Sequence, residues 1–475
     1  QVSSELPNTR LLFMQSSGGL TDAHQFQGKD AILSGPAGGI VGMVRSCKEA
    51  GFNKIIGFDM GGTSTDVSHY GGEYEREFET QVAGVRMRAP MMSIHTVAAG
   101  GGSILHFDGA RLRVGPDSAG ANPGPACYRR GGKLAITDAN VMLGRIQPEF
   151  FPHVFGTQAN QPLDSNIVKQ KFEHLSKQIK ESTGGDKSPE QLAQGFLEIA
   201  IGSMAEAIKK ISVQRGHDVT KYTLVVFGGA GGQHACAVAD ALAMTTIFAH
   251  PLAGVLSAYG MGLADQTVMR ETTIEQPLND ESVKNLDKTF SSLSATAVQN
   301  LINQGVDSKN IVVINRVHLK YEGTDSALVV DLGNTKQMQL QFESIYKQRY
   351  SFLMSERNLI IEAISVEAIG AGNSSEVTIE NFTPRISPLK PNAIKLTYFD
   401  HAWHDTPVFV RTDIRPGDII IGPAIIAEAN ATTLVEPEWQ AEVTPLNHLV
   451  LKRIKARKTK FAIGTQVDQI GRAHV

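Results

Sequence analysis

Residues 57–66 combine acidic, glycine and hydroxyl side chains in a pattern that can bind a phosphate group. The run reads Gly-Phe-Asp-Met-Gly-Gly-Thr-Ser-Thr-Asp and follows an apolar segment that predicts a buried strand. Gly61 and Gly62 let the backbone approach a bulky anion and turn its N–H groups toward it. Hydroxyl side chains that can bind phosphate oxygens follow directly, at Thr63, Ser64 and Thr65.

Two carboxylates, Asp59 and Asp66, flank this turn. Because Mg²⁺ prefers carboxylate, phosphate and water oxygens, we expect the pair to hold Mg²⁺ directly or through water, as metal ligands and catalytic residues. Asp66 can instead orient an attacking oxygen, and the sequence does not separate the two roles. The alternative for the whole run is a polar hairpin turn with capping aspartates. The presence of two glycines, three hydroxyl side chains and two carboxylates within ten residues disfavours it.

The spacing excludes two other phosphate-binding loops. No Gly-Lys-Ser/Thr follows the glycines, as a Walker loop requires, and their spacing does not match the dinucleotide-binding fingerprint. The run resembles the phosphate hairpin of the ATPase superfamily that includes actin, the heat-shock chaperones and the sugar kinases. This resemblance implies ATP and Mg²⁺ as cofactors.

A second glycine cluster follows the apolar run at residues 222–227. In the same superfamily a later strand followed by glycines lies against adenosine, since glycine lets a flat ring and a ribose rest on the backbone. The candidate nucleotide-contacting glycines are Gly228, Gly229, Gly231 and Gly232. His234, at the start of the next expected helix, is a candidate for contacting phosphate or substrate. The alternatives are a tight strand-to-helix turn and a packed or capping histidine.

Two further runs, residues 93–103 and 114–125, are too rich in glycine for ordinary strands. Loops punctuated in this way usually position backbone groups at a site, so we expect both to do so here. Structural turns without a functional part are the alternative.

The expected elements place these runs in an α/β framework. Strands are expected at residues 11–14, 54–59, 67–70 and 222–227, and the second and third form a hairpin around the phosphate-binding turn. Helices are expected at residues 188–214, 234–243 and 280–304, the first with Ser188 as N-cap, an apolar stripe and Gly216 as C-cap. Short β-rich runs dominate from residue 311 onward. The strand, glycine loop and helix around residue 230 form one βα unit.

Composition narrows the class of protein. The 475 residues correspond to about three domains. The net charge of −3 and the absence of a long apolar span argue against nucleic-acid and membrane partners. Three scattered cysteines argue against a disulfide framework and a cysteine zinc site, and with no visible signal peptide they favour a cytoplasmic location. Glycine- and alanine-rich helices lead us to expect an oligomer.

Several longer runs together resemble the hydantoinase A / 5-oxoprolinase family. They are residues 34–39, 57–66, 95–103, 115–128, 215–218, 227–235, 321–325 and 422–428. The resemblance covers nearly the whole chain and is strongest to the ATP-dependent 5-oxoprolinase branch. N-methylhydantoinase A and the acetone and acetophenone carboxylase subunits are more distant relatives.

The resemblance implies an ATP-dependent hydrolase of a small cyclic amide, opening 5-oxo-L-proline to L-glutamate. Phosphorylation of the lactam oxygen makes the ring carbon electrophilic, and water then opens the ring. Phosphoryl transfer needs positioning and charge neutralisation, which Asp59 and Asp66 with Mg²⁺ and the N–H groups of residues 61–63 suit. Candidates for activating the water are His95, Asp117 and His234. The alternatives are activation of a hydantoin, activation of a ketone with bicarbonate, and a non-catalytic lobe.

The resemblance also implies that the chain is a piece of a larger enzyme. Family members carry an earlier hairpin of Asp-x-Gly-Gly-Thr-x-x-Asp type, so residues 59–66 are expected to be the second of a pair that clamps the phosphates. A B-type region, fused or as a separate subunit, is the expected partner, and the isolated piece is expected to be inactive without it. Many relatives carry an acidic residue at the position of Ser93, so any metal-ligand set that includes His95 is incomplete here.

The expected fold class is α/β, with an actin-like ATPase lobe followed by an α+β part and a mostly β C-terminal part. The expected divisions are residues 1–272 for the ATPase-like domain, 273–383 for the α+β domain, 384–455 for the β-rich domain and 456–475 for a tail.

Overall fold

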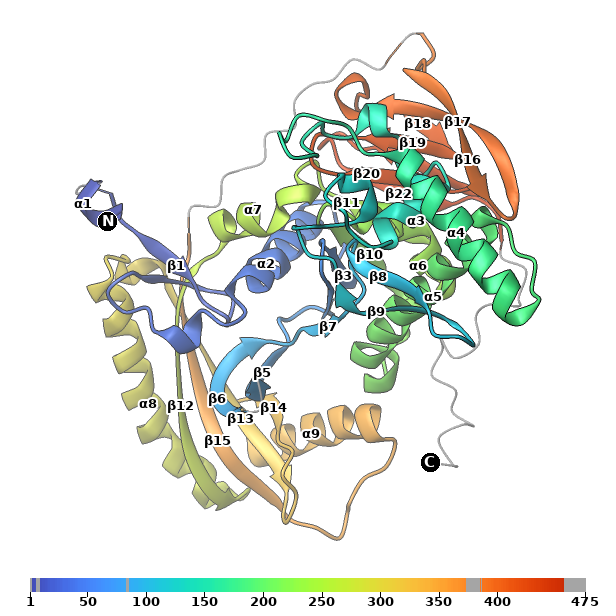
Figure 1. Ribbon diagram of the computed structural model, residues 1–475. Helices are drawn as coiled ribbons and strands as arrows, with labels where there is room; N and C mark the ends of the chain where they lie inside the picture. The colour runs from blue at the N-terminus through green and yellow to red at the C-terminus, as the bar shows by residue number, and fades with distance from the viewer. Residues whose placement is uncertain (1, 6–8, 83–84, 373–384, 386, 457–475) are drawn as a thin grey trace.

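The computed structural model describes residues 2–5, 9–82, 85–372, 385 and 387–456. Its centre is an eight-stranded mixed sheet (Figure 1). In spatial order the strands are β18 (Ile419–Ile421), β21 (Trp439–Val443), β22 (Leu449–Arg453), β11 (Thr246–Ala249), β10 (Thr223–Phe227), β3 (Ile55–Met60), β4 (Thr65–Tyr70) and β7 (His95–Val97). Strands β3, β10 and β11 are parallel, and the remaining neighbours pair antiparallel. The expected strands and hairpin around the phosphate-binding turn are confirmed.

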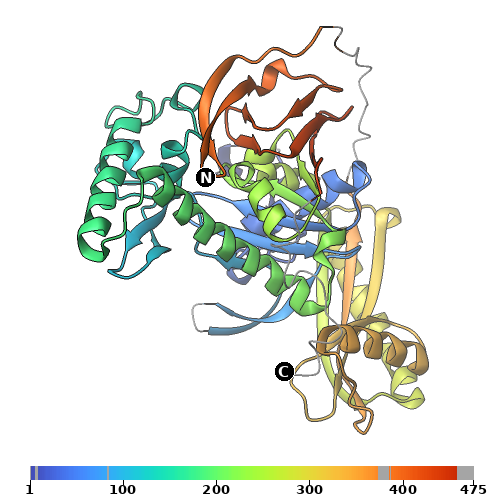
Figure 2. The same ribbon diagram turned by 90° about the vertical axis from the view of Figure 1, so that its right-hand side faces the viewer.

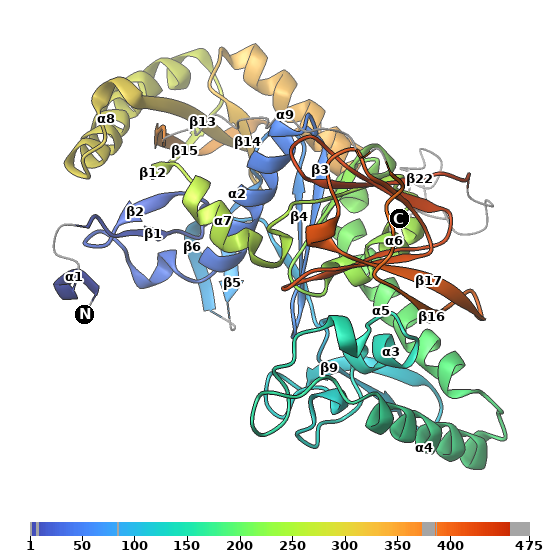
Figure 3. The same ribbon diagram turned by 90° about the horizontal axis from the view of Figure 1, so that it is seen from above.

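Helices cover both faces of this central sheet (Figure 3). α2 (Ser34–Glu49) and α7 (Leu256–Leu263) lie on one face, where Ile55 and Phe227 enter an apolar core with the α2 residue Val41. α5 (Pro189–Ile211) and α6 (Ala235–Ala241) lie on the other face and form the largest core with Phe58 and Val67. A mixed sheet covered on both faces is the architecture expected for an actin-like lobe.

None of the helices expected from the sequence corresponds to α2. Its glycines lower helix propensity, yet they serve helix packing. A Cβ atom on Gly260 of α7 would lie 1.9 Å from the carbonyl oxygen of Gly38, and one on Gly42 would lie 2.8 Å from that of Leu256. The two helices can therefore approach this closely only without side chains. These glycines pack within the chain, and the expected oligomer stays a prediction.

Helix α5 begins as expected, with the Ser188 hydroxyl accepting the N–H of Gln191 in a capping box. The helix ends earlier than expected, at Ile211, and a 3₁₀ turn, η4 (Val213–Arg215), follows it. Gly216, with φ of 84°, closes that turn rather than the helix. The C-terminal part of the predicted helix was therefore wrong by one turn.

A second sheet of six strands forms a separate layer with its own core. Its order is β1 (Leu12–Met14), β2 (Leu20–Asp22), β12 (Gln266–Pro277), β15 (Leu359–Gly370), β13 (Ile311–Tyr321) and β14 (Leu328–Asp331). Helices α8 (Asp280–Asn303) and α9 (Thr335–Tyr350) contribute Phe290 and Phe342 to its apolar cluster. Figure 2 shows this α+β layer, in yellow and orange, projecting away from the C-terminal strands in red.

The C-terminal strands divide between two sheets. Strands β16 (Ala393–Phe399), β17 (Ala402–Val410), β19 (Ala424–Ala427) and β20 (Thr432–Val435) form a four-stranded sheet, whereas β18, β21 and β22 extend the central one. The expected mostly β character of this part is confirmed. The proposed domain boundaries remain a prediction, and the expected tail lies outside the described residues except for residue 456.

The smaller elements complete the scaffold around the glycine runs. Two-stranded ribbons join β5 (Arg76–Val82) to β6 (Val85–Met92) and β8 (Ser103–Phe107) to β9 (Leu112–Ser118), and short helices α1 (Val2–Glu5) and α3 (Ile136–Met142) accompany the longer α4 (Ser165–Thr183). Strands β7 and β9 show that the expectation of no ordinary strand in residues 93–103 and 114–125 was wrong. In β9 the register shifts opposite Ile104, and Gly115 takes a φ of 66° there, so the glycine serves an irregularity within a strand. Among the described residues no helix is both long and apolar enough to cross a membrane.

Candidate active site

The β3–β4 hairpin places its two aspartates side by side. Asp59 and Asp66 are directly opposite in the antiparallel register, and the turn between them is closed by the Gly61 N–H donating to the Ser64 carbonyl at 3.1 Å. The Thr96 hydroxyl on β7 donates to Asp66 Oδ1 at 2.6 Å. Both carboxyls therefore face the same side of the central sheet, toward α2.

Burial changes the acidity of both carboxyls. Burial, and secondly the charge of Asp66, raises the pKa of Asp59 to about 6. Burial also raises the pKa of Asp66, and the hydrogen bond from Thr96 opposes this shift. A cavity of about 10 Å³ adjoins both carboxyls and is also lined by Pro36 and Phe227, which leaves room for about one water-sized occupant. Two adjacent carboxylates beside such a space fit a divalent cation, which would relieve their repulsion.

The glycine run at residues 98–103 braces the hairpin turn. The N–H groups of Gly101 and Gly102 donate to the carbonyl oxygens of Gly61 and Gly62 at 3.0 and 2.6 Å. A Cβ atom on Gly100 would lie 2.5 Å from the backbone of Thr63 and Ser64. This contact requires glycine, and it fixes the turn from behind.

The loop after β10 meets the hairpin from the other side. Phe227 pairs with Asp59 in the parallel register, and the Ala230 N–H donates to the Met60 carbonyl at 3.1 Å. A Cβ atom on Gly228, whose φ is 77°, would lie 2.5 Å from Asp59 Oδ1. The sequence-predicted phosphate hairpin and nucleotide-contacting loop therefore lie in direct contact, although more than 160 residues separate them in the chain.

These loops line a common cavity of about 430 Å³, within the size range of ligand pockets. Gly61 and Gly62 from the hairpin, Gly101 and Gly102 from the bracing run, and Gly229 from the second glycine cluster form its polar backbone wall. Larger side chains close the remaining sides; they include Tyr128, Phe151, Gln233, Val255 and Glu428. Asp59 and Asp66 line the small cavity beside the same hairpin and not this larger one.

The amino-acid sequence matches a known family over nearly its full length. The family model described as hydantoinase/oxoprolinase matches residues 1–270, and that of the hydantoinase/oxoprolinase C-terminal domain matches residues 274–452. This chain belongs to the hydantoinase/oxoprolinase family. The resemblance inferred from the glycine-rich motifs is thus confirmed.

Relatives within the family include curated proteins from several kingdoms. The chain is 40% identical to 5-oxoprolinase of Saccharomyces cerevisiae over 98% of its own length and 37% of that protein. It is 40% identical to 5-oxoprolinase 1 of Arabidopsis thaliana over 95% of its length and 36% of that protein. It is 29% identical to caprolactamase subunit alpha of Pseudomonas jessenii over 91% of its length and 63% of that subunit. The chain thus spans little more than a third of the length of the 5-oxoprolinases that it matches.

Known structures confirm the fold. An ATP-dependent caprolactamase from Pseudomonas jessenii superposes with a TM-score of 0.83 at 28% identity, covering 94% of this chain and 66% of that one. A nucleotide-free acetone carboxylase superposes with a TM-score of 0.71 at 20% identity, covering 94% of this chain and 64% of that one. The α/β fold with an actin-like lobe is therefore shared with these proteins.

Some predicted nucleotide-binding residues of this family member lie behind the cavity. Thr65 is buried, and its hydroxyl donates to the Ala99 carbonyl at 2.6 Å, so it braces the hairpin. Gly231 and Gly232 are buried, and a Cβ atom on Gly232 would lie 2.7 Å from the Thr432 carbonyl oxygen of β20. Thr63 and Ser64 form the tip of the turn, where Thr63 is exposed.

The structure does not bring the three candidates for water activation together. His95 is opposite Val67 whereas Asp66 is opposite Thr96, so the alternation of strand residues places His95 on the other face of the sheet from the aspartates. Asp117 is exposed on β9 and does not line the cavity. His234 is buried beside Asn140, 3.3 Å from its side-chain amide, and burial lowers its pKa to about 3. It is a packed, neutral histidine, which was the alternative interpretation.

Sequence reasoning missed Glu428 as a candidate site residue. It follows β19, lines the cavity and lies 3.6 Å from Arg411. Burial raises its pKa to about 7, and the charge of Arg411 opposes the shift. The available signal was an acidic residue at the end of a buried apolar run, the same pattern that drew attention to Asp59.

Proposed function

We propose that the polypeptide containing this chain uses ATP to hydrolyse a small cyclic amide, and that 5-oxo-L-proline, opened to L-glutamate, is its substrate. The observation that carries this proposal is the cavity in which the Asp59–Asp66 hairpin meets the loop after β10. Membership of the family and 40% identity to two 5-oxoprolinases support the choice of substrate.

In this proposal the hairpin binds the phosphates and the second loop binds adenosine. The Gly61 N–H closes the turn, so Gly62 and Thr63 present their backbone N–H groups to phosphate oxygens, while Gly229 offers a surface without a side chain to the ribose and base. Asp59 and Asp66 are the residues that would hold Mg²⁺, which neutralises charge on the transferring phosphoryl group. The bracing hydrogen bonds from Gly101 and Gly102 hold the turn in place, so little reorganisation is needed at the moment of transfer.

The reaction overcomes the resonance stability of the amide in two steps. The lactam oxygen attacks the γ-phosphorus of ATP and ADP leaves, so the ring carbon becomes electrophilic. Water then adds to that carbon and the ring C–N bond breaks, which frees the amino group and leaves an acyl phosphate. A second water hydrolyses the acyl phosphate to L-glutamate and phosphate. Two water molecules are consumed for each ATP and each lactam.

We further propose that a B-type region completes the active enzyme. The chain covers only 37% of the yeast relative, and the caprolactamase relative is named as an alpha subunit. The isolated piece is then expected to bind nucleotide without catalysing lactam hydrolysis. All three cysteines are free and buried, which supports a reducing, cytoplasmic location.

The test measures ADP and glutamate release by the natural polypeptide with Mg²⁺ and ATP. Reactions contain 5-oxo-L-proline, hydantoin, caprolactam, or acetone with bicarbonate. We expect ADP release matched by glutamate only with 5-oxo-L-proline. Stimulation by another compound alone would move the proposal to that substrate, and no stimulation by any of them would contradict it.

A further inference from the structure

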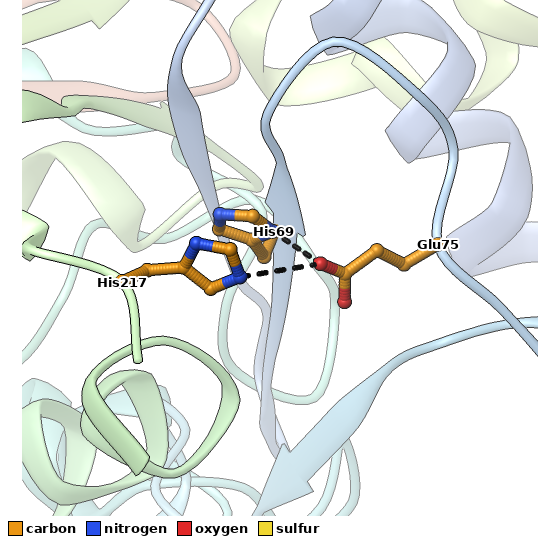
Figure 4. Close-up of side chains that lie close together, drawn as sticks. All are labelled: His69, Glu75 and His217. Atoms are coloured by element: carbon orange, nitrogen blue, oxygen red, sulfur yellow. Dashed lines mark hydrogen bonds and ion pairs between the residues drawn. The ribbon is translucent and has the colours of Figure 1, made fainter. Parts of the chain in front are cut away.

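A second group of functional side chains lies away from the proposed nucleotide cavity. The group consists of His69 on β4, Glu75 in the segment that follows β4, and His217 between η4 and η5 (Val219–Lys221). Both imidazoles lie next to the same oxygen of the Glu75 carboxylate (Figure 4). Glu75 Oε1 lies 2.5 Å from His69 Nδ1 and 3.9 Å from His217 Nε2. One ligand atom from each of the three residues lies within 4.8 Å of the other two.

This group is separate from the Asp59–Asp66 pair. His69 follows Asp66 by three residues on β4, a distance of roughly 10 Å along an extended strand. Strand alternation also directs the two side chains to opposite faces of the central sheet. Any ligand at His69 is therefore distinct from a cation at the hairpin.

The surroundings orient the three side chains. The imidazole rings of His69 and His217 stack with centroids 4.1 Å apart and planes 27° apart. His217 Nδ1 lies 3.2 Å from the Gln348 amide nitrogen and 3.4 Å from the Tyr222 hydroxyl. The Nε2 of His217 is directed to Glu75, and the Tyr222 hydroxyl is the neighbour that can accept a hydrogen bond from Nδ1–H.

Among the described residues, one oxygen of the Glu75 carboxylate is bound by a neighbouring guanidinium and the other is not. Arg215, the cation in contact with this carboxylate, donates to Glu75 Oε2 at 2.8 Å and is also 3.2 Å from Glu77. Oε1 is therefore left to the histidines.

We propose that His69, Glu75 and His217 form a binding site for Zn²⁺. Two imidazole nitrogens and one carboxylate oxygen are a zinc-ligand set that leaves a fourth position open. Ligand atoms of a tetrahedral zinc site lie roughly 3.3 Å apart. The three atoms here lie within 4.8 Å of one another, so zinc binding requires the carboxylate to shift and the two stacked rings to tilt until both nitrogens point at the metal. Glu75 and His217 also line a cavity of about 460 Å³ between the central and second sheets, into which the open position can face.

The test measures metal binding by the natural polypeptide, without an activity readout. The protein is stripped with a chelator, loaded with Zn²⁺ and dialysed, and its metal content and Zn²⁺ dissociation constant are measured. Co²⁺ in place of Zn²⁺ adds a visible absorption spectrum that reports nitrogen and oxygen coordination. We expect one tightly held Zn²⁺ more than in a variant that lacks the ligands.

The variants His217→Asn and Glu75→Gln are expected to weaken Zn²⁺ binding at this site by at least about tenfold, each with an unchanged circular dichroism spectrum. His174→Asn, an exposed histidine on α4, is the matched control and is expected to bind Zn²⁺ like the unaltered protein. Because His217 is partly exposed, its replacement is the variant least expected to disturb folding. Equal Zn²⁺ content in all four proteins, or no retained Zn²⁺ in the unaltered one, would overturn the proposal.

Because none of these measurements depends on ATP or on a lactam, failure of the zinc site leaves the proposed function intact. Failure of the lactam assay likewise leaves the zinc measurement valid. The two proposals are therefore tested independently.

Discussion

At the scale of single residues, the candidate site contains carboxyl groups whose surroundings disfavour the negatively charged form. Asp59 is largely removed from water, lies opposite Asp66 and touches the backbone of Gly228. Its pKa of about 6 means that the folded chain holds a proton there more tightly than the unfolded chain does. The free energy of unfolding contributed by this group is therefore largest at low pH and is lost as the pH rises from about 4 through 6.

We expect Asp59→Asn to raise the unfolding free energy of the metal-free protein at pH 7.5 by about 1–2 kcal/mol, after reduction for residual solvent at the site. The same variant is expected to lose at least about 100-fold in ATP turnover, because it loses a ligand for Mg²⁺. Thermal unfolding as a function of pH and steady-state ADP release check the two effects. Asp287→Asn, at an exposed position on α8, is the control and should change neither. A less stable Asp59→Asn protein at pH 7.5 would contradict this account.

Glu428 predicts a pH dependence of nucleotide binding. Its pKa of about 7 means that it acquires a negative charge on the cavity wall between pH 6 and 8. Glu428→Gln should therefore bind Mg²⁺-free ATP more tightly than the unaltered protein at pH 8, by roughly 3- to 10-fold, and about equally at pH 6. Binding titrations at the two pH values measure this ratio, with the exposed Glu356→Gln as control. A ratio independent of pH would show that Glu428 does not face the nucleotide.

At the scale of elements, structures that depend on neighbouring residues were predictable from the sequence, whereas those that depend on distant contacts were not. The hairpin, the strand before Gly228 and the Ser188 cap were predictable because their patterns reside in neighbouring residues. Helix α2 was not, because the reason for its glycines is the close approach of α7, more than 200 residues later in the chain. The position of His95 also depends on a strand register, β4 with β7, that its own sequence does not encode.

The contact between α2 and α7 predicts a sharp difference between two glycines of one helix. Gly260→Ala would place its Cβ against the Gly38 carbonyl and should lower the unfolding free energy by about 1–3 kcal/mol. Gly262→Ala has open space around its Cβ and should be neutral or stabilising by up to about 1 kcal/mol, because alanine favours a helix. Denaturant unfolding midpoints compare the two. Equal destabilisation by both would mean that helix propensity, not the packing of α7 on α2, sets the effect.

At the scale of the whole molecule, a buried ion pair joins the central lobe to the second sheet. Arg76 of β5 donates both guanidinium N–H groups to the Glu367 carboxylate of β15, at 3.0 and 2.7 Å, and both side chains are almost fully buried. A pair of this kind contributes little net stability compared with apolar residues, but loss of one partner leaves the other charge buried without a counter-charge. It therefore ties the two sheets into one geometry.

We expect Glu367→Ala to lower the unfolding free energy by about 3–5 kcal/mol and to expose the boundary between the sheets to protease. Replacement of both partners by methionine should recover most of the lost unfolding free energy, because no charge of the pair then remains buried. Unfolding curves and limited proteolysis of the single and double variants test this expectation. If the double variant were as unstable as Glu367→Ala, apolar packing rather than the charge pair would hold the sheets together.

The pairing of β22 with β11 has a consequence for synthesis on the ribosome. Ala249 pairs with Leu449, so 200 residues must be translated after β11 before its outer edge is covered. Until then the nascent chain presents a strand edge next to Ile247 and Phe248, which are fully buried in the finished protein. Exposed edges of this kind recruit other strands. The growing polypeptide is therefore exposed to pairing with other strands during that interval, and slowing translation after residue 249 should increase its aggregation.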